Sequence, residues 1–284
     1  MTQGIVVGVD GTEQAHAAAE WAADEAVLRG TGVQLVHARE PWPESVVPFA
    51  TGGTEESWAE DLLARTAERL RGRHPGLPVS TRVLASGPAP GLVAAAESGE
   101  LLVLGSRALG EVAGYLVGSV ALTVAGAVER PLVLVRALGD AFPSGPVTVG
   151  VDARQPVDAV LGFAFEEAAR RGSGVHAVYA QQLPLYATLG PEMVPDIRVA
   201  VAPEIERALD EALEPWRSKY ADVPAVARVL IGSAGQELVS AAADAALVVV
   251  GRRTRRSTLG AHLGSVTHCV LHHSRAPVVL VPHD

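Results

Sequence analysis

Two loops in this sequence combine glycines with a hydroxyl side chain in an order that suits the binding of phosphate. Gly105 precedes a Gly-Ser pair at 118–119, and Gly251 precedes one at 264–265 at the same spacing. A loop that leads into a helix offers unpaired backbone N–H groups and the positive end of the helix dipole. Glycine also lets the backbone approach an anion without a Cβ in the way. Each loop therefore fits a phosphate chain, although a Gly-Ser pair before a helix also occurs as an ordinary helix cap.

An aspartate follows the first apolar run of each half of the chain, Asp10 in the first and Asp152 in the second. An isolated aspartate after a strand most often caps the helix that follows. In open parallel sheets, however, ligands bind at the carboxyl ends of the strands where the winding direction reverses. Because the glycine loops belong to the same expected edge, their presence favours a binding role for both aspartates.

Two further groups of side chains could do chemistry. A dense basic run comprises Arg252, Arg253, Arg255 and Arg256. This run fits either a solvated loop or a phosphate-binding segment, because arginine can hold phosphate through two parallel hydrogen bonds.

Five histidines lie in the last part of the chain, at positions 262, 268, 272, 273 and 283. Those at 268 and 272 have the spacing of metal ligands on a helix, but no carboxylate or thiolate completes the set, so an exposed helix face is expected.

The remaining unusual side chains are expected to pack. Cys269 is interpreted as a small packed residue, and Trp21, Trp58 and Trp216 as core or interface aromatics. A chain with a single cysteine cannot form an internal disulfide, which fits a reducing cytoplasm.

Composition limits the partners of the chain. A formal net charge of −9 argues against general binding to nucleic acid or anionic lipid. No apolar run approaches the roughly 20 residues of a membrane span, and the start lacks the pattern of a secretory signal. Hydrophobic residues make up 48% and aromatic residues 4%, which favours helices packed on Val-rich strands. We expect a cytoplasmic protein with neither a nucleic-acid nor a membrane partner.

The elements that position these residues form an internal repeat. Residues 24–38 match residues 166–180 at an offset of 142, with eight of fifteen identical, and later pairs match at an offset of 146. A net insertion of four residues must therefore lie between Ala180 and Val229. The Gly/Pro-rich segment 137–146 is interpreted as a linker. These features predict two domains, at 1–138 and 145–284.

Each copy alternates short Val/Leu-rich runs with Ala-rich helical stretches, which is typical of βαβ units. We predict an α/β fold with two tandem doubly wound domains, each a five-stranded parallel sheet of order 3-2-1-4-5 with helices on both faces. The winding then reverses between strands 1 and 4, where Asp10 meets Gly105 and Asp152 meets Gly251. The expected strands are 5–9, 33–38, 79–84, 101–105 and 131–135, then 147–151, 175–180, 225–230, 247–251 and 277–281. The expected helices of the first copy are 13–29, 55–72, 89–98 and 118–129.

The motifs together resemble the universal stress protein family. The first copy has Val-Gly-Val-Asp at the first strand end, then Gly-x-x-Ala-(nine residues)-Gly-Ser, then Pro-Leu-Val-Leu-Val. The family's nucleotide motif is Gly-x-x-Gly-(nine residues)-Gly-Ser/Thr. Its middle glycine is replaced by Ala108 in the first copy and by Thr254 in the second. Alanine fits a glycine position better than β-branched threonine does, so the second copy departs further.

The resemblance implies that the chain binds ATP, with Mg²⁺ as an accompanying ion. It places Asp10 near the ribose and the metal, and the backbone of 36–38 near the base, with Asp152 and 178–180 in the second copy. The candidate nucleotide positions of the first copy are Asp10, Gly11, Val36, Ala38, Gly105, Ala108, Gly118, Ser119 and Val120. Those of the second copy are Asp152, Val178, Ala180, Gly251, Arg252, Thr254, Gly264, Ser265 and Val266. Because Thr254 and Arg154 add bulk, we expect the first copy to fill at lower ATP concentration.

The expected function is that of a cytoplasmic ATP-binding protein with a nucleotide-dependent stress or regulatory role, a description that the resemblance supplies. Two alternatives stay open: a slow ATPase or nucleotide hydrolase, and an interaction scaffold with vestigial nucleotide sites. The sequence lacks the Gly-Lys-Ser/Thr of a P-loop and shows no evident general base near the loops. We further expect the two domains to pair through their last strands, 131–135 against 277–281, with a protein partner and a homodimer as further associations.

Overall fold

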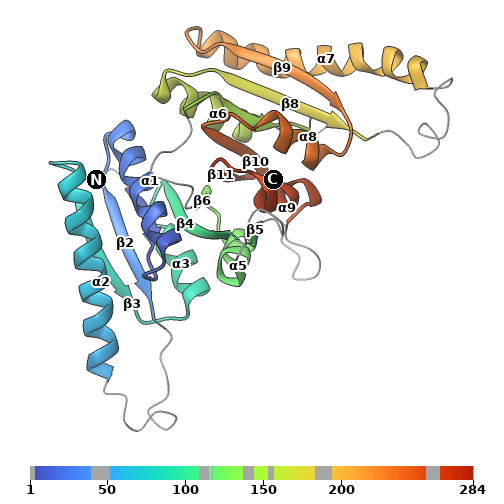
Figure 1. The fold of residues 1–284 in the computed structure, drawn as a ribbon. Helices are drawn as coiled ribbons and strands as arrows, with labels where there is room; N and C mark the ends of the chain where they lie inside the picture. Colours follow the sequence, from blue (N-terminus) through green and yellow to red (C-terminus); the bar gives the residue numbers. More distant parts are fainter. Residues whose placement is uncertain are drawn as a thin grey trace. The chain divides into compact units, whose positions relative to one another are not determined.

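The computed structural model describes residues 4–39, 52–108, 115–116, 118–136, 144–152, 157–182, 194–253 and 263–283. The chain divides into two compact units, Met1–Asp140 and Ala141–Asp284. Figure 1 shows that each unit alternates strands with helices along the chain. Each unit is described below by itself.

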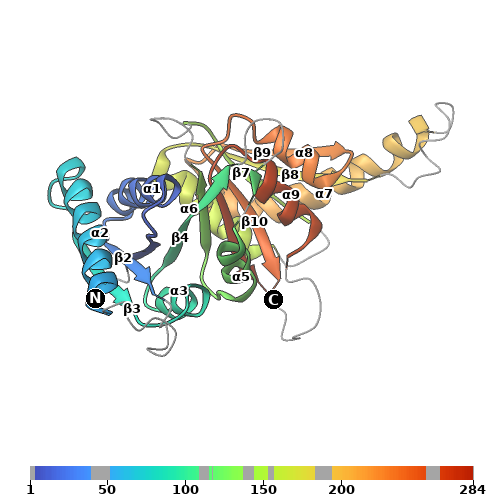
Figure 2. The same ribbon diagram turned by 60° about the horizontal axis from the view of Figure 1, so that its bottom comes forward.

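The first unit is a parallel sheet covered on both faces. Its strands are β1 (Ile5–Gly8), β2 (Val33–Ala38), β3 (Val79–Leu84), β4 (Leu101–Ala108) and β6 (Leu132–Arg136), with a two-residue strand β5 (Tyr115–Leu116). The helices are α1 (Glu13–Arg29), α2 (Gly52–Arg73), α3 (Pro88–Ala96) and α5 (Ser119–Ala127). Figure 2 shows α1 and α2 on one face of this sheet and α3 and α5 on the other.

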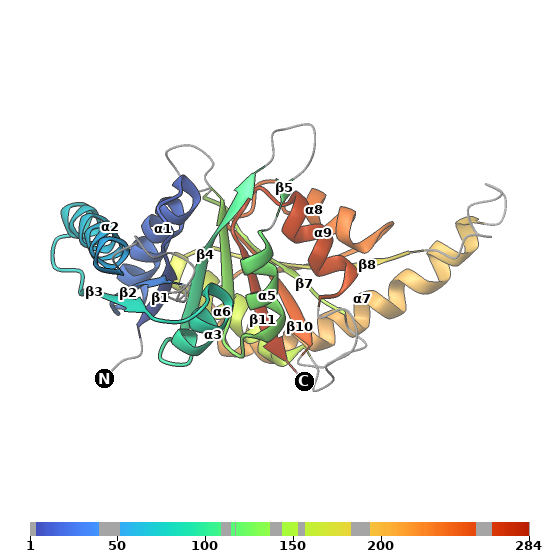
Figure 3. The same ribbon diagram turned by 90° about the horizontal axis from the view of Figure 1, so that it is seen from below.

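The second unit repeats the arrangement. Its strands are β7 (Val147–Gly150), β8 (Val175–Gln181), β9 (Ala225–Ile231), β10 (Leu247–Arg253) and β11 (Val278–His283). The helices are α6 (Asp158–Arg171), α7 (Val194–Lys219), α8 (Ala234–Ala241) and α9 (Ser265–His273). Figure 3 shows α8 and α9 on one side of these strands and α6 and α7 on the other.

The strand order confirms the predicted doubly wound α/β fold. In the first unit the order is β3-β2-β1-β4-β6, with parallel pairing throughout. In the second unit it is β9-β8-β7-β10-β11, again parallel. Strand β5, which pairs antiparallel with the end of β4, has no counterpart among the predicted strands. The winding reverses beside β1 and β4 in one unit and beside β7 and β10 in the other.

The core consists of aliphatic side chains on both faces of each sheet. Strand β1 is buried through Ile5, Val6 and Val7, and β10 through 247–250. Continuous burial of this kind explains why these strands appear in the sequence as unbroken apolar runs.

Helices α1 and α6 each end at a glycine with positive φ, 62° at Gly30 and 60° at Gly172. Glycine adopts this backbone conformation, which ends a helix, at low energetic cost.

The four-residue insertion lies in the long helix of the second unit. Helix α7 has 26 residues and its counterpart α2 has 22. The offset between the copies is 142 up to the start of these helices and 146 from their ends onward. The extra residues therefore add about one helical turn and leave the strand order unchanged.

Candidate functional site

The first unit has a pocket of about 270 Å³ at the carboxyl ends of its central strands. Asp10 and the end of β1 form one wall, and Gly105 on β4 lies beside it. The start of α5, at 118–121, forms another wall, and 36–38 at the end of β2 completes the pocket. The topology thus brings segments from four parts of the first copy to one edge of the sheet.

Asp10 is held in a turn and does not cap helix α1. Its Oδ1 accepts hydrogen bonds from the backbone N–H of Thr12 at 3.0 Å and from the Thr12 hydroxyl at 2.6 Å. The N-cap is Thr12, whose Oγ1 accepts from the backbone N–H of Ala15 at 3.2 Å. Gly11 between them has a φ of 84°, which a side chain would strain. The capping explanation for Asp10 therefore fails, and its exposed carboxylate faces the pocket that it lines.

The start of helix α5 is an uncapped helix end. Gly118 is its N-cap, with φ −61° and ψ 153°, and no side chain supplies a cap hydrogen bond. The first backbone bond within the helix runs from the N–H of Leu122 to the carbonyl of Gly118 at 3.0 Å. The N–H groups of Ser119 and Val120 precede that bond and both residues are exposed. An anion in the pocket can accept hydrogen bonds from these groups.

Gly105 is required by packing. A Cβ at this position would lie 2.5 Å from the backbone carbon of Gln14 and 2.7 Å from the backbone nitrogen of Ala15. Strand β4 thus passes directly under the first turn of α1, and only glycine allows this approach. A Cβ at Gly118 would meet no heavy atom within 4 Å, so packing does not require glycine there.

Two aromatic side chains beside the first pocket were not predicted to belong to it, although the backbone of 36–38 was. His37 lines the pocket, and its Nδ1 lies 2.7 Å from the carbonyl oxygen of Val9. Since a carbonyl only accepts, Nδ1 carries the proton and donates. Trp58 stands edge-on to His37 at 5.4 Å between ring centroids and is 47% exposed, so of the two expected positions, core or interface, it does not occupy the core. The helical pattern of the sequence did not indicate that Trp58 on α2 lies beside Gly11.

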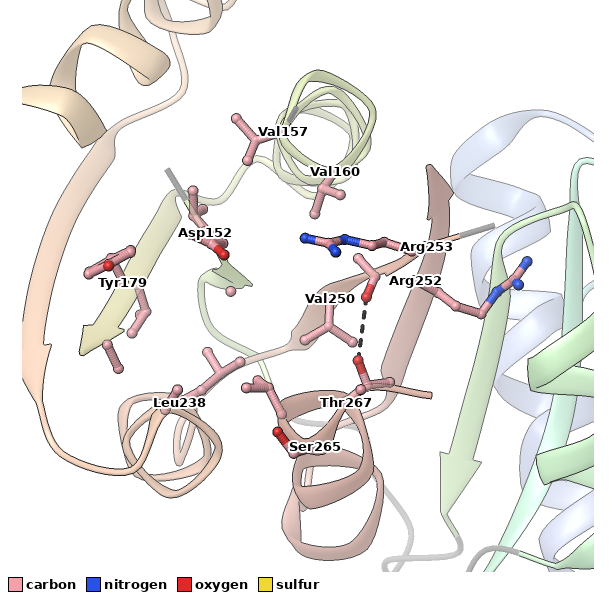
Figure 4. Close-up of a pocket in the computed structure, with 18 of the residues that line it drawn as sticks. Asp152, Val157, Val160, Tyr179, Leu238, Val250, Arg252, Arg253, Ser265 and Thr267 are labelled. Atoms are coloured by element: carbon pink, nitrogen blue, oxygen red, sulfur yellow. Dashed lines mark hydrogen bonds between the residues drawn. The ribbon is translucent and has the colours of Figure 1, made fainter. Parts of the chain in front are cut away.

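The second unit has a pocket of about 590 Å³ at the corresponding edge. Figure 4 shows Asp152 on one side, Ser265 at the start of α9, and the side chain of Arg253 directed past Val160 toward the Asp152 side. Gly264 is again an N-cap without a side-chain cap bond, with φ −68° and ψ 159°. The hydroxyl of Thr267 donates to the carbonyl of Gly251 at 3.4 Å and ties α9 to β10.

The basic residues of β10 separate in the structure. The side chain of Arg253 is exposed and points toward the Asp152 side of the pocket, whereas that of Arg252 is buried and extends the other way. Alternation along a strand explains this, because neighbouring side chains point to opposite faces. Arg252, which was a candidate, borders the pocket, and Arg253 is the residue whose guanidinium enters it.

Most candidate positions meet in these two pockets. Gly11 lies beside the first pocket, against Trp58 and Leu62, and Ala108 ends β4. Thr254, Arg154, Arg255, Arg256 and His262 lie outside the described residues. The candidates that line the first pocket are Asp10, Val36, Ala38, Gly105, Gly118, Ser119 and Val120. Those that line the second are Asp152, Val178, Ala180, Gly251, Arg252, Gly264, Ser265 and Val266.

The pocket volumes run against the expected difference in affinity. The expectation was that bulk would obstruct the second copy, yet its pocket has about twice the volume of the first. Tighter binding by the first copy stays a prediction, without support from pocket size.

The other reactive side chains form no further site in the described parts of the chain. There, no group of three or more His, Cys, Asp or Glu side chains could hold a metal ion. His268 and His272 stack on α9 with 4.4 Å between ring centroids. Burial raises the pKa of the Cys269 thiol, which makes it less reactive. Among the described helices, none is both long and apolar enough to cross a membrane.

Comparisons of sequence and of structure with known proteins indicate the same family along nearly the whole chain. Residues 1–136 and 144–282 match the Universal stress protein family. A universal stress protein of Mycobacterium tuberculosis is 32% identical over 288 residues, which cover 98% of this chain and 96% of the relative. One from Mycolicibacterium smegmatis is 29% identical over 290 residues, with 98% and 95% covered. The crystal structure of a universal stress protein from Archaeoglobus fulgidus covers 100% of both chains with a TM-score of 0.76 and 16% identity, a likeness of fold.

Proposed function

Since the chain belongs to the universal stress protein family, we propose that both of its units bind an adenine nucleotide, with ATP as the ligand, and that occupancy regulates a stress response. One observation carries this proposal. In each unit an uncapped Gly-Ser helix start and an aspartate line the same pocket at the edge where the sheet reverses direction. Free N–H groups suit phosphates, and a carboxylate suits ribose hydroxyls or a metal ion.

The first pocket offers a separate surface for each part of a nucleotide. The phosphates lie against the N–H groups at the start of α5, opposite Asp10. The base lies beside 36–38, where Val36 and Ala38 offer apolar contact and His37 a ring nitrogen. The second pocket offers Asp152, the start of α9, and the end of β8 in the same roles.

The donor set of the first pocket fits Mg²⁺ bound together with a nucleotide. Mg²⁺ usually takes one or two protein carboxylates and completes its shell with phosphate oxygens and water. Among the described lining residues Asp10 is the one carboxylate, and one of its oxygens is already held by Thr12. The ion would neutralise phosphate charge, while Asp10 would hold it at the edge of the pocket.

Binding is favoured over hydrolysis as the activity of this site. A hydrolase needs a group placed to activate water in addition to the group that holds the metal. Asp10 cannot serve both purposes in the first pocket, and it is the one carboxylate among the described residues that line it. A slow ATPase would show as release of phosphate that Asp10→Ala abolishes.

Calorimetric titration with ATP and Mg²⁺ tests the proposal. We expect Asp10→Ala to weaken binding by the first unit about tenfold or more, through loss of a charge-assisted contact. The matched control is Asp61→Ala, an exposed aspartate on α2 away from the pocket. Mass analysis of ligand released from the freshly purified protein identifies the nucleotide. Absence of both a released nucleotide and any titration heat would contradict the proposal and favour a scaffold with vestigial sites.

We also propose that the chain acts in the cytoplasm as a two-domain unit that pairs through its last strands and presents a nucleotide-dependent surface to a protein partner. The tandem family match supports a functional pair of domains. Cysteines introduced in β6 and β11, in a Cys269→Ser background, should cross-link within one chain. A cross-link that forms only between chains would point to a homodimer in place of this pairing.

A further inference from the structure

Each unit has an outer strand with one side that meets no other described strand. Among the strands that the structure describes, β3 pairs with β2 alone and β9 pairs with β8 alone. Most residues of both strands are at least partly exposed, whereas β1 and β7 are mostly buried. An open sheet edge presents unpaired backbone N–H and C=O groups, to which a strand of another molecule can add. The chain therefore has two edges at which its copies could join.

The backbone pairing shows which groups of β3 face this open side. The N–H of Val33 donates to the carbonyl of Pro78 at 2.8 Å, and the N–H of Arg39 donates to that of Leu84 at 2.9 Å. The register between β2 and β3 is continuous over the whole strand. In a parallel pair the backbone groups of alternate residues point to opposite sides of the strand. The even-numbered residues of β3 therefore face β2, and the odd-numbered residues face outward.

Strand β9 has the same arrangement. The N–H of Val175 donates to the carbonyl of Pro224 at 2.8 Å, and the register between β8 and β9 is continuous. The odd-numbered residues of β9 therefore face outward as well.

An arginine occupies the first outward carbonyl of each edge. Nη2 of Arg71, in the last turn of α2, donates to the carbonyl oxygen of Val79 at 2.6 Å. Nη2 of Arg217, in the last turn of α7, donates to the carbonyl oxygen of Ala225 at 3.3 Å. Val79 and Ala225 are the first residues of their strands, and both are odd-numbered. Each guanidinium thus takes the acceptor that an added strand would use first.

The internal repeat relates the two edges. The offset of 146 takes Arg71 to Arg217, and it also takes Arg82 in β3 to Arg228 in β9. The side chains of Arg82 and Arg228 are exposed. Each edge thus combines one arginine on its backbone with a second within the strand. Two copies that paired at such an edge would bring like charges together, which opposes pairing.

We propose that Arg71 and Arg217 keep the outer edges of the two units from pairing with the edges of other copies of this chain. Without Arg71, strand β3 offers the outward groups of Val79 and Thr81 to another molecule. Without Arg217, strand β9 offers those of its own first outward residues. Because each unit has one such edge, loss of one arginine permits joining at one edge, and loss of both permits open-ended assemblies.

Sedimentation equilibrium at increasing protein concentration tests this proposal. The double variant Arg71→Ala/Arg217→Ala is compared with the parent protein and with Arg65→Ala/Arg207→Ala. The control removes two exposed arginines from the same helices and changes the net charge equally. We expect the mean mass of the double variant to reach at least about twice that of the parent, with a smaller increase in each single variant. The mass of the control should equal that of the parent.

Proline substitutions test whether the edges are the surfaces that associate. Thr81 and Ala227 are odd-numbered residues of the two strands, so proline there removes an outward N–H and leaves the pairing within the sheet intact. Added together to the double variant, Thr81→Pro and Ala227→Pro should return the mass to that of the parent.

Two outcomes would overturn the proposal. A double variant that melts at a lower temperature but keeps the mass of the parent would show that the arginines only fix the turn between helix and strand. Association that persists after both proline substitutions would show that it does not occur through these edges. Neither outcome depends on nucleotide binding, so both leave the proposed function untouched.

Discussion

Replacing Gly118 by valine should abolish nucleotide binding by the first unit with little effect on its fold. The backbone of Gly118 is open to any residue, and an added Cβ meets no atom within 4 Å. Valine is a poorer N-cap than glycine by about 0.5–1 kcal/mol. In the pocket, its branched side chain would keep phosphate from the N–H groups of α5. Loss of two charge-assisted hydrogen bonds, at about 1.5–3 kcal/mol each, corresponds to at least about 100-fold in affinity.

Gly105, the first glycine of the same motif, should show the opposite effect: a substitution there should lower the stability of the fold. Alanine at Gly105 would place its Cβ 2.5–2.7 Å from backbone atoms of Gln14 and Ala15, so β4 and α1 must move apart. Overpacking of this kind costs about 1–3 kcal/mol of unfolding free energy. Gly105→Ala should therefore lower the melting temperature by about 3–10 °C.

Calorimetry measures the expected loss of ATP binding in Gly118→Val, and thermal melting measures the expected loss of stability in Gly105→Ala. Both variants are made in the Gly264→Val background, so that heat of ATP binding comes from the first unit alone. We expect Gly118→Val to lose binding and to melt within about 3 °C of its parent. The reasoning is refuted if Gly118→Val binds ATP as its parent does, or if Gly105→Ala melts at the parent's temperature.

Three further variants test other parts of the structure. Gly251→Ala should destabilise less than Gly105→Ala in thermal melts, because its nearest neighbour is the end of the His283 side chain and not backbone. Arg29→Met should lower the unfolding free energy in denaturant by about 3–5 kcal/mol, since it removes the ion pair between Arg29 and the buried carboxylate of Glu25. Burial and then the charge of Arg228 lower the pKa of His176 below 6.5, so the unfolded chain binds the proton more readily and stability is lost as pH falls through that region. His176→Gln should reduce the loss of stability between pH 7 and pH 5 in melting experiments, and an unchanged profile would contradict this.

The fold was predictable because two independent patterns in the sequence agree. The central strands are short apolar runs buried on both faces, such as 101–104, and the repeat places a matching run in the other copy. Parallel strands with helical crossovers leave few topologies open. The two aspartates and the two Gly-Ser pairs could be assigned to one edge of the sheet from that topology alone.

The details of the site depended on geometry that a sequence pattern does not contain. Asp10 and Thr12 are both good cap residues, and only the backbone turn at Gly11 makes Thr12 the cap. Arg253 enters the second pocket because β10 extends to that residue, beyond the end expected at 251. Trp58 has the spacing of a core residue, but its position near the start of α2 leaves it half exposed beside His37.

The turn at Asp10 has a consequence for how a duplicated gene can diverge. Thr12 holds the first turn of α1 whether or not Asp10 is present, so a substitution at Asp10 removes only two exposed hydrogen bonds, at about 0.5–1.5 kcal/mol each. Selection for a stable fold therefore retains Thr12, while Asp10 is retained by selection for the ligand. Under relaxed selection the first copy can lose or change its ligand by drift while still folding, and the other copy keeps the original role.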